Sequence, residues 1–170
     1  MINSKNFDVK IVEGIYTAFG FRDLVERYAT TIFNQAGQLP ATSFLRFGGG
    51  KIACVTWWQW QDDHGKGLAI RSARNLATVL SATEYAFISE AWMRVEELKG
   101  RTLDQAMNDQ PHFRISEMPD RQECVMICFE AKGKPMDALK FDIVRDANGT
   151  GKMTNRTPTN THGGFVTGIL

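Results

Sequence analysis

The stretch TSFLRFGGGKIACVTWWQW, residues 42–60, decides the fold of this chain. Its two halves, Thr42 to Phe47 and Lys51 to Trp60, are rich in the β-branched and aromatic residues that are typical of strands. Only Gly48-Gly49-Gly50 separates them, and glycine adopts the positive φ values that a tight turn needs. Because parallel strands require a long crossover, a connection this short predicts an antiparallel β-hairpin.

One helix is predicted before this hairpin in the sequence and one after it. Phe21 to Ala36 carries apolar residues at helical spacing, and Gly37 followed by Leu39-Pro40 is a typical helix end. A second helix, roughly Leu68 to Ala82, has a stripe of small apolar residues that favours close packing on a sheet. The stretch from Phe7 to Phe19 fits either a strand or a further helical turn.

Three further strands are predicted in the second half of the chain. Tyr85 to Val95 and Glu123 to Ala131 are strongly apolar, and Ala138 to Arg145 alternates between apolar and polar residues. The last two are joined by Lys132-Gly133-Lys134-Pro135, a typical hairpin turn. Between the first two lies a long polar connection, Glu96 to Arg121.

The order helix, hairpin, helix, strand, hairpin predicts a two-layer α+β domain. We expect a mainly antiparallel sheet of about five strands, with both main helices on one face. This single domain spans residues 1–146. Residues 147–170, rich in Thr, Asn and Gly, are interpreted as an irregular C-terminal arm whose apolar end could dock on this domain or on a neighbour.

Composition and charge limit the possible functions. A chain of 170 residues with 43% hydrophobic and 23% charged residues is typical of one globular domain. The net charge of +1 gives no overall attraction for nucleic acid or for an anionic membrane. Hydrophobic runs are short and the N-terminus lacks an apolar signal core, so we predict a cytoplasmic protein without a membrane partner.

The three cysteines agree with a reducing compartment. Cys54, Cys124 and Cys128 lie in apolar strand-like segments, and their odd number argues against a disulfide framework. On one strand, Cys124 and Cys128 would lie on the order of 13 Å apart, beyond disulfide reach. Buried free thiols are the prediction.

The order of elements and three short motifs resemble a loose group of uncharacterised bacterial and phage proteins. The motifs are Ser89-Glu90-Ala91-Trp92, the later Pro119-Asp120-Arg121-Gln122-Glu123, and the Gly37-Gln38-Leu39-Pro40 bend. The resemblance covers roughly residues 20–146. It implies a fold neighbourhood and an origin in a mobile element, and it carries no activity.

Three of the four tryptophans, Trp57, Trp58 and Trp60, lie within four residues. A tryptophan gains most when it is buried or when it anchors a partner. On a strand, Trp58 and Trp60 share one face while Trp57 takes the other. Since one face must meet the helices, at least one ring is expected to face outward, where it would contact a protein partner.

The polar stretch from Asp62 to Gly67 offers two further interpretations. Asp62, Asp63 and His64 are metal-competent, but adjacent side chains rarely converge on one ion, and a polar loop at a helix start is the favoured interpretation. Lys66 within Gly65-Lys66-Gly67, together with Arg71 and Arg74, could contact a phosphate or a nucleic acid, or form a solvated helix face.

Glu90 is the strongest single candidate for catalysis. On a regular strand it shares a face with Ile88 and Trp92. A buried and unpaired carboxyl there would have a raised pKa and could act as a general acid. Pairing with an arginine, or exposure at the strand end, is the favoured expectation.

One apparent nuclease signature fails on distance. Asp120 and Glu130 belong to a Pro-Asp…Glu-x-Lys pattern whose carboxylates must share one metal ion. If the intervening residues form one strand, the two carboxylates are about 33 Å apart. We therefore predict no metal site.

These observations favour a non-catalytic binding or assembly protein that self-associates or contacts other proteins. The expected contact residues lie in the Trp-rich strand, in the second helix and in the arm: Trp57, Trp58, Trp60, Lys66, Arg71, Arg74, Phe165, Ile169 and Leu170. One alternative is a small hydrolase-like enzyme that uses Glu90 with Asp63 or His64. A second alternative is a nucleic-acid-contacting protein. No cofactor is predicted.

Overall fold

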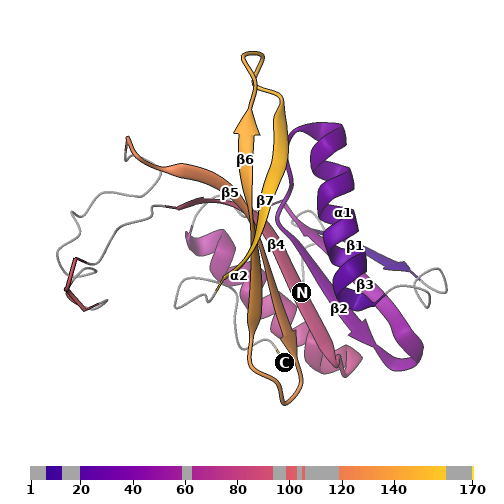
Figure 1. Ribbon diagram of the computed structural model, residues 1–170. Helices are drawn as coiled ribbons and strands as arrows, with labels where there is room; N and C mark the ends of the chain where they lie inside the picture. The colour runs from indigo at the N-terminus through magenta and orange to yellow at the C-terminus, as the bar shows by residue number, and fades with distance from the viewer. Residues whose placement is uncertain are drawn as a thin grey trace.

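The computed structural model describes residues 7–12, 20–58, 63–93, 99–102, 105, 119–159 and 170. Within these ranges, two helices and one seven-stranded antiparallel sheet make an α+β fold (Figure 1). The elements are β1 (Phe7–Val12), α1 (Phe21–Ala36), β2 (Thr42–Phe47), the short 3-10 turn η1 (Gly48–Gly50), β3 (Lys51–Trp57), α2 (Asp63–Leu80), β4 (Glu84–Met93), β5 (Gln122–Ala131), β6 (Asp137–Arg145) and β7 (Gly151–Thr159).

The strands follow the order β1-β3-β2-β4-β5-β6-β7 across the sheet, and every neighbouring pair is antiparallel. The predicted hairpin is confirmed as β2–β3, with Gly49 and Gly50 at φ 72° and 78° in its turn. The second predicted hairpin is confirmed as β5–β6. Its turn contains Gly133 at φ 76°.

The two helices lie on opposite faces of the sheet. On β4, Ala86 and Ile88 belong to the apolar cluster that includes α1, whereas Tyr85 and Phe87 belong to the cluster that includes α2. Successive side chains of a strand point to opposite faces, so each helix covers its own face. Figure 1 shows α1 in front of the strands and α2 behind them. The prediction of two layers with both helices on one face is therefore wrong.

The central strands explain this difference. Four of the six residues of β2 and five consecutive residues of β4 are buried, so apolar side chains are needed on both faces. Continuous apolar runs of this kind are typical of strands covered on both sides. The apolar run is visible in the sequence of Tyr85 to Val95, but the two-layer prediction covered only one face of this strand with helices.

The sheet has seven strands where about five were predicted, because β7 was missed and the stretch that contains β1 was not counted as a strand. The ambiguous N-terminal stretch contains β1, and the arm interpreted as irregular contains β7, which pairs with β6. In β7 only Gly151 is buried. The other residues of β7 are exposed or only partly buried, so the strand leaves little apolar pattern in the sequence.

The helix boundaries match the prediction for α1 and correct it for α2. Phe21–Ala36 forms α1, and the N–H of Gly37 (φ 67°) donates to the carbonyl of Phe33 at 2.7 Å and ends it. Helix α2 begins at Asp63, so residues 63–67 lie in its first turns and not in a polar loop. Gly65 and Gly67 have a low helix propensity, which is why the sequence pattern indicates a later start for this helix.

Candidate functional site

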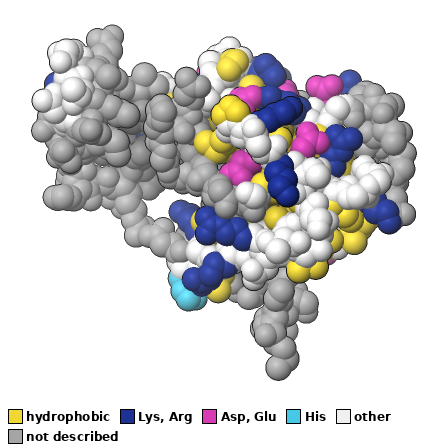
Figure 2. All heavy atoms as spheres, turned by 90° about the horizontal axis from the view of Figure 1, so that it is seen from below, with side chains coloured by type: hydrophobic (Ala, Val, Ile, Leu, Met, Phe, Trp, Pro, Cys, Tyr) yellow, Lys and Arg dark blue, Asp and Glu magenta, His cyan; other side chains and the backbone are white. Residues whose placement is uncertain are grey.

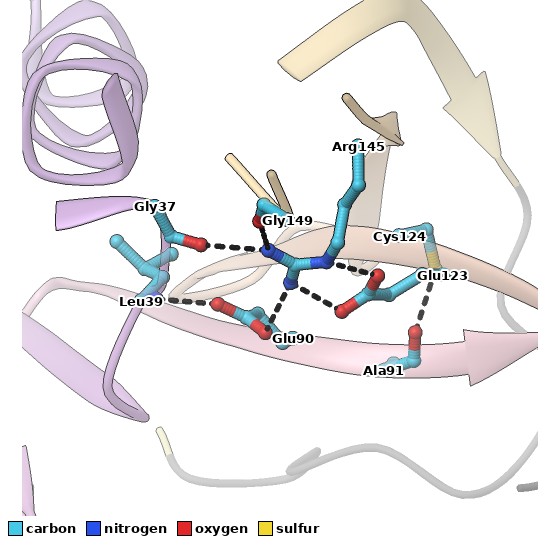
Figure 3. A network of polar contacts seen from close by, with 8 residues as sticks. All are labelled: Gly37, Leu39, Glu90, Ala91, Glu123, Cys124, Arg145 and Gly149. Carbon is cyan, nitrogen blue, oxygen red and sulfur yellow. Dashed lines mark hydrogen bonds and ion pairs between the residues drawn. The ribbon is translucent and has the colours of Figure 1, made fainter. Parts of the chain in front are cut away.

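Arg145, at the end of β6, ties four segments of the chain together on the α1 face (Figure 3). Its Nε and Nη2 donate to both carboxylate oxygens of Glu123 on β5, at 2.7 and 2.5 Å. Its Nη1 donates to the carbonyl of Gly37 after α1 at 3.0 Å and to that of Gly149 in the β6–β7 turn at 3.3 Å. Its Nη2 also lies 3.8 Å from Oε2 of Glu90 on β4.

Glu90 is paired on both of its oxygens. Its Oε1 accepts a hydrogen bond from the backbone N–H of Leu39 at 2.5 Å, while Oε2 faces Arg145. The expectation that a cation pairs with Glu90 is confirmed. The side chain is about a quarter exposed, so it lies at the surface end of the buried strand.

Opposing influences act on the ionisation of Glu90. Burial raises its pKa above the ordinary value and outweighs the hydrogen bond from Leu39, which lowers it. The neighbouring carboxylate of Glu123 also raises the pKa, and Arg145 lowers it. With both carboxylates ionised, two negative charges surround one guanidinium, which leaves the cluster with a formal charge of −1.

Two cavities adjoin Glu90. The larger, of about 470 Å³, is lined by the end of α1, the β6–β7 turn, Glu90 and Arg145. The smaller, of about 270 Å³, is lined by Leu39, Pro40, Ala41, Trp57, Trp58, Ser89 and Glu90. The smaller cavity combines apolar walls with a single carboxylate, which is typical of a site that accepts an apolar or amphipathic group.

The tryptophans at the end of β3 have different environments. Trp57 is buried, and its Nε1 donates to Ser43 Oγ at 2.8 Å; Ser43 Oγ in turn lies 3.0 Å from the hydroxyl of Tyr85. Trp58 is 57% exposed and lines the smaller cavity. The expected division into a core ring and an outward ring is confirmed for these two, while Trp60 lies outside the described residues.

The structure does not bring Glu90 and His64 together. Glu90 follows Ala86 and Ile88 on the α1 face, whereas α2, which contains Asp63 and His64, packs on the opposite face. His64 is exposed and lines neither of the two cavities at Glu90; the side chain of Asp63 lies outside the described residues.

The basic candidates all lie on α2. Arg71 and Arg74 are exposed and Lys66 is half-buried. On the face drawn in Figure 2, Lys and Arg side chains gather near one margin, while acidic, basic and hydrophobic side chains are interspersed over the rest of the described part. A mixed surface of this kind adds no strong support for nucleic-acid binding.

Only the last residue of the predicted apolar tail is described. Leu170 is 38% exposed, and its backbone N–H donates to Oε2 of Glu130 on β5 at 3.4 Å. Phe165 and Ile169 lie outside the described residues. The chain end thus touches its own sheet at this residue.

The nuclease-like pattern and two of the three cysteines lie as predicted. One continuous strand, β5, separates Asp120 from Glu130. Cys124 and Cys128 are buried free thiols, and Cys54 is a partly buried one. Burial raises the pKa of Cys54 and Cys124 to about 11 and that of Cys128 to about 12, so all three are protonated at neutral pH.

Within the described ranges, no group of three or more His, Cys, Asp or Glu side chains could hold a metal ion. The helices of this part of the chain are also too short or too polar to cross a bilayer.

The sequence interpretation missed the residue that organises this site. In the sequence pattern, Arg145 is the last residue of one predicted strand and Glu123 is the first residue of another, and neither position indicates a functional site. Glu90, Glu123 and Arg145 come together through the pairing of β4 with β5 and of β5 with β6. The register between β4 and β5 follows a long connection, so it could not be set from the sequence.

No family model matches the chain, and no curated protein or solved structure is significantly similar to it. The resemblance to bacterial and phage proteins stays a prediction.

Proposed function

We propose that this chain is a protein-binding or assembly protein that anchors a partner at Trp58. The observation that carries the proposal is an exposed tryptophan that lines a cavity with a buried floor. Trp58 is 57% exposed, whereas Leu39, Ala41, Trp57 and Ser89 around it are nearly inaccessible. Aromatic anchors beside preformed pockets dominate the energetics of protein interfaces.

The cavity chemistry favours a basic or long aliphatic side chain of the partner. Leu39, Pro40 and Ala41 offer apolar contacts to methylene groups, and Glu90 offers a carboxylate beside them. The formal charge of −1 on the Glu90–Arg145–Glu123 cluster attracts a cation. A lysine or arginine placed between Trp58 and Glu90 would gain both a cation–π contact and an ion pair.

The bonding around Glu90 supports binding better than catalysis. All three nitrogens of the Arg145 guanidinium are engaged by protein oxygens, and both oxygens of Glu90 face protein donors. A general acid or an anion-binding arginine needs a free valence directed at a substrate. Arg145 therefore holds the cavity wall in place, whereas each oxygen of Glu90 keeps a second lone pair that can accept from a partner's cation.

Selection of a phage-displayed library of random peptides for binding to the wild-type protein tests the proposal. We expect enriched peptides that carry Lys or Arg beside an apolar residue. The variant Trp58→Ala should bind these peptides at least about tenfold more weakly. Glu90→Gln should lower the affinity for the basic peptides by a smaller factor, because it removes the charge and keeps the shape of the side chain.

The matched control is Val79→Ala, since Val79 is 80% exposed on α2 and does not line the cavity. This variant should retain wild-type affinity. Peptides that bind Trp58→Ala as tightly as the wild type would show that the proposal is wrong.

A further inference from the structure

Strand β1 forms one outer edge of the sheet, and all four of its residues with described side chains are exposed. β1 pairs only with β3, so the other side of its backbone has no strand partner among the described residues. Val9 and Ile11 are 40% and 58% exposed. Backbone donors and acceptors along an open edge with apolar side chains form a template for another strand.

The two faces of β1 differ in character. Val9 and Ile11 pair with Val55 and Ala53 of β3, so they extend the apolar face covered by α2. Asp8 and Lys10 point to the α1 face. Neither charged side chain forms an ion pair with another described residue.

We propose that two copies of this chain associate through their β1 strands, antiparallel and about a two-fold axis at Val9. In this register Val9 lies opposite Val9 of the second copy. Asp8 lies opposite Lys10, and Lys10 opposite Asp8. Two ion pairs form on one face and apolar contacts form on the other, and the two sheets become one.

The charges select this register among the alternatives. A slip of one residue moves the apolar set to the other face and is excluded by side-chain alternation. A shift of the two-fold axis to Lys10 places the two Lys10 side chains opposite each other, and a shift to Asp8 does the same for the two aspartates. Like charges directly opposite are destabilising, so only the axis at Val9 satisfies all four charged groups.

Charge exchange at positions 8 and 10 tests the register. Asp8→Lys places lysine against lysine at both pairs, and Lys10→Asp places aspartate against aspartate. Each single variant should dimerise at least about tenfold more weakly than the wild type in sedimentation equilibrium. The double variant, with both changes in one chain, should recover the wild-type dissociation constant.

Mixing the two single variants gives the sharper measurement. Each variant then supplies the charges that the other lacks, so native mass spectrometry should show the heterodimer in excess over both homodimers. The control is Lys152→Asp on β7, which makes the same charge change on an exposed residue of the other edge and should leave dimerisation unchanged.

Disulfide trapping locates the axis independently. In Val9→Cys the two introduced thiols face each other, and oxidised glutathione should give a covalent dimer. In Ile11→Cys they lie about 13 Å apart along the strands, beyond disulfide reach, so no covalent dimer should form. The wild type measures any background from the native cysteines.

Three results would overturn the proposal: a wild-type protein that is monomeric at its highest soluble concentration, a double variant that does not recover, or equal cross-linking at positions 9 and 11. None of these depends on peptide binding at Trp58, so this interface and the proposed function fail separately. Circular dichroism of each variant verifies the fold, since residues 8–11 are exposed.

Discussion

The two edges of this one sheet are built differently. β1 keeps a regular register with β3 over all its residues and alternates charged with exposed apolar side chains. β7 has a register shift opposite Lys140 and Asp142, Asn155 at a positive φ of 49°, and Pro158 near its end. Bulges and proline are features by which natural sheets prevent edge-to-edge pairing. The comparison indicates that β7 ends the sheet, whereas β1 leaves it open.

The inner side of β7 is also attached to the core. Gly151 packs so closely on Phe33 of α1 that an added Cβ would lie 2.8 Å from the ring. Arg156 donates to both carboxylate oxygens of Glu26 on α1, at 2.8 and 3.0 Å. No such link to a helix is present among the described contacts of β1. An edge that is attached resists exchange, and an edge that is not attached is available to a partner.

Removal of Arg145 should have the largest effect, because this side chain holds the turn that starts β7. Arg145→Ala leaves Glu90 and Glu123 without their cation and frees the carbonyls of Gly37 and Gly149. Arg145 is about a third exposed, so water screens part of each ion pair, but its removal leaves two carboxylates and two backbone carbonyls without this donor, and we expect a loss of about 2 kcal/mol of unfolding free energy. Urea denaturation at a protein concentration that keeps the chain monomeric measures this loss.

The control for that measurement is Arg156→Ala. Its side chain is half exposed, so its pair with Glu26 should contribute less than about 1 kcal/mol. Equal losses for the two arginines would contradict the interpretation that Arg145 is the structural centre of this region.

A methyl group at Gly151 should have a comparable effect. In Gly151→Ala the new Cβ meets the Phe33 ring at 2.8 to 2.9 Å and Nη1 of Arg145 at 3.1 Å. Because Phe33 is fully buried, the strand must move outward, and we expect a loss of about 2 kcal/mol by thermal or urea unfolding.

Gly67→Ala makes the same chemical change where no atom is within 4 Å of the added Cβ. This glycine lies in α2, so the alanine should stabilise the protein by about 0.5–1 kcal/mol. If both substitutions destabilise equally, the close contact between β7 and α1 is not what holds that edge.

The contributions of Asp142 and Glu90 to stability should change with pH in opposite directions. Asp142 accepts from Lys140 at 2.7 Å and from Asn155 of β7 at 3.0 Å, and these contacts lower its pKa below the usual 3.8. Its contribution is present above pH 3.8 and is lost as the pH falls through the lowered pKa. The stability difference between the wild type and Asp142→Asn should therefore shrink in acid.

Glu90 should show the opposite trend. Burial raises its pKa above the usual 4.5, so its contribution is present at low pH and is lost as the pH rises through the raised pKa. The variant Glu90→Gln should gain stability relative to the wild type between acid and neutral pH. Urea titrations over this range measure both variants, and the same sign for the two would contradict these assignments.

The sequence predicted the elements that have a strong apolar pattern and missed those that lack one. The periodicity of residues 21–36 and the Gly48–Gly50 turn were sufficient for α1 and the β2–β3 hairpin. β7 was missed because its residues show little apolar pattern, and the stretch that contains β1 stayed open between a strand and a helical turn. The faces of the helices were predicted wrongly because the continuous apolar run of β4, which is typical of a strand covered on both sides, was assigned only one covered face.

The candidate site was predicted in part. Glu90, its pairing with a cation and the division between Trp57 and Trp58 follow from strand alternation and the cost of burying a charge. Arg145 and Glu123 reach Glu90 only through the registers of three strands, one of which follows a long connection. A tertiary register of this kind is set by the packing of the whole sheet, so local patterns do not reveal it.

The smallest expected effect on the monomer is at β1, and it tests the open edge most directly. Ile11→Thr replaces an apolar side chain that is 58% exposed, so the unfolding free energy of the monomer should change by no more than about 0.5 kcal/mol. Dimerisation should weaken several-fold, because the polar group enters the apolar face of the paired strands. Val144→Thr is the matched control, since Val144 is 57% exposed on β6 and away from the β1 edge. A loss of dimerisation with both variants would indicate general hydrophobic association. A loss with Ile11→Thr alone would show that β1 is an interface that contributes little to the fold of its own chain.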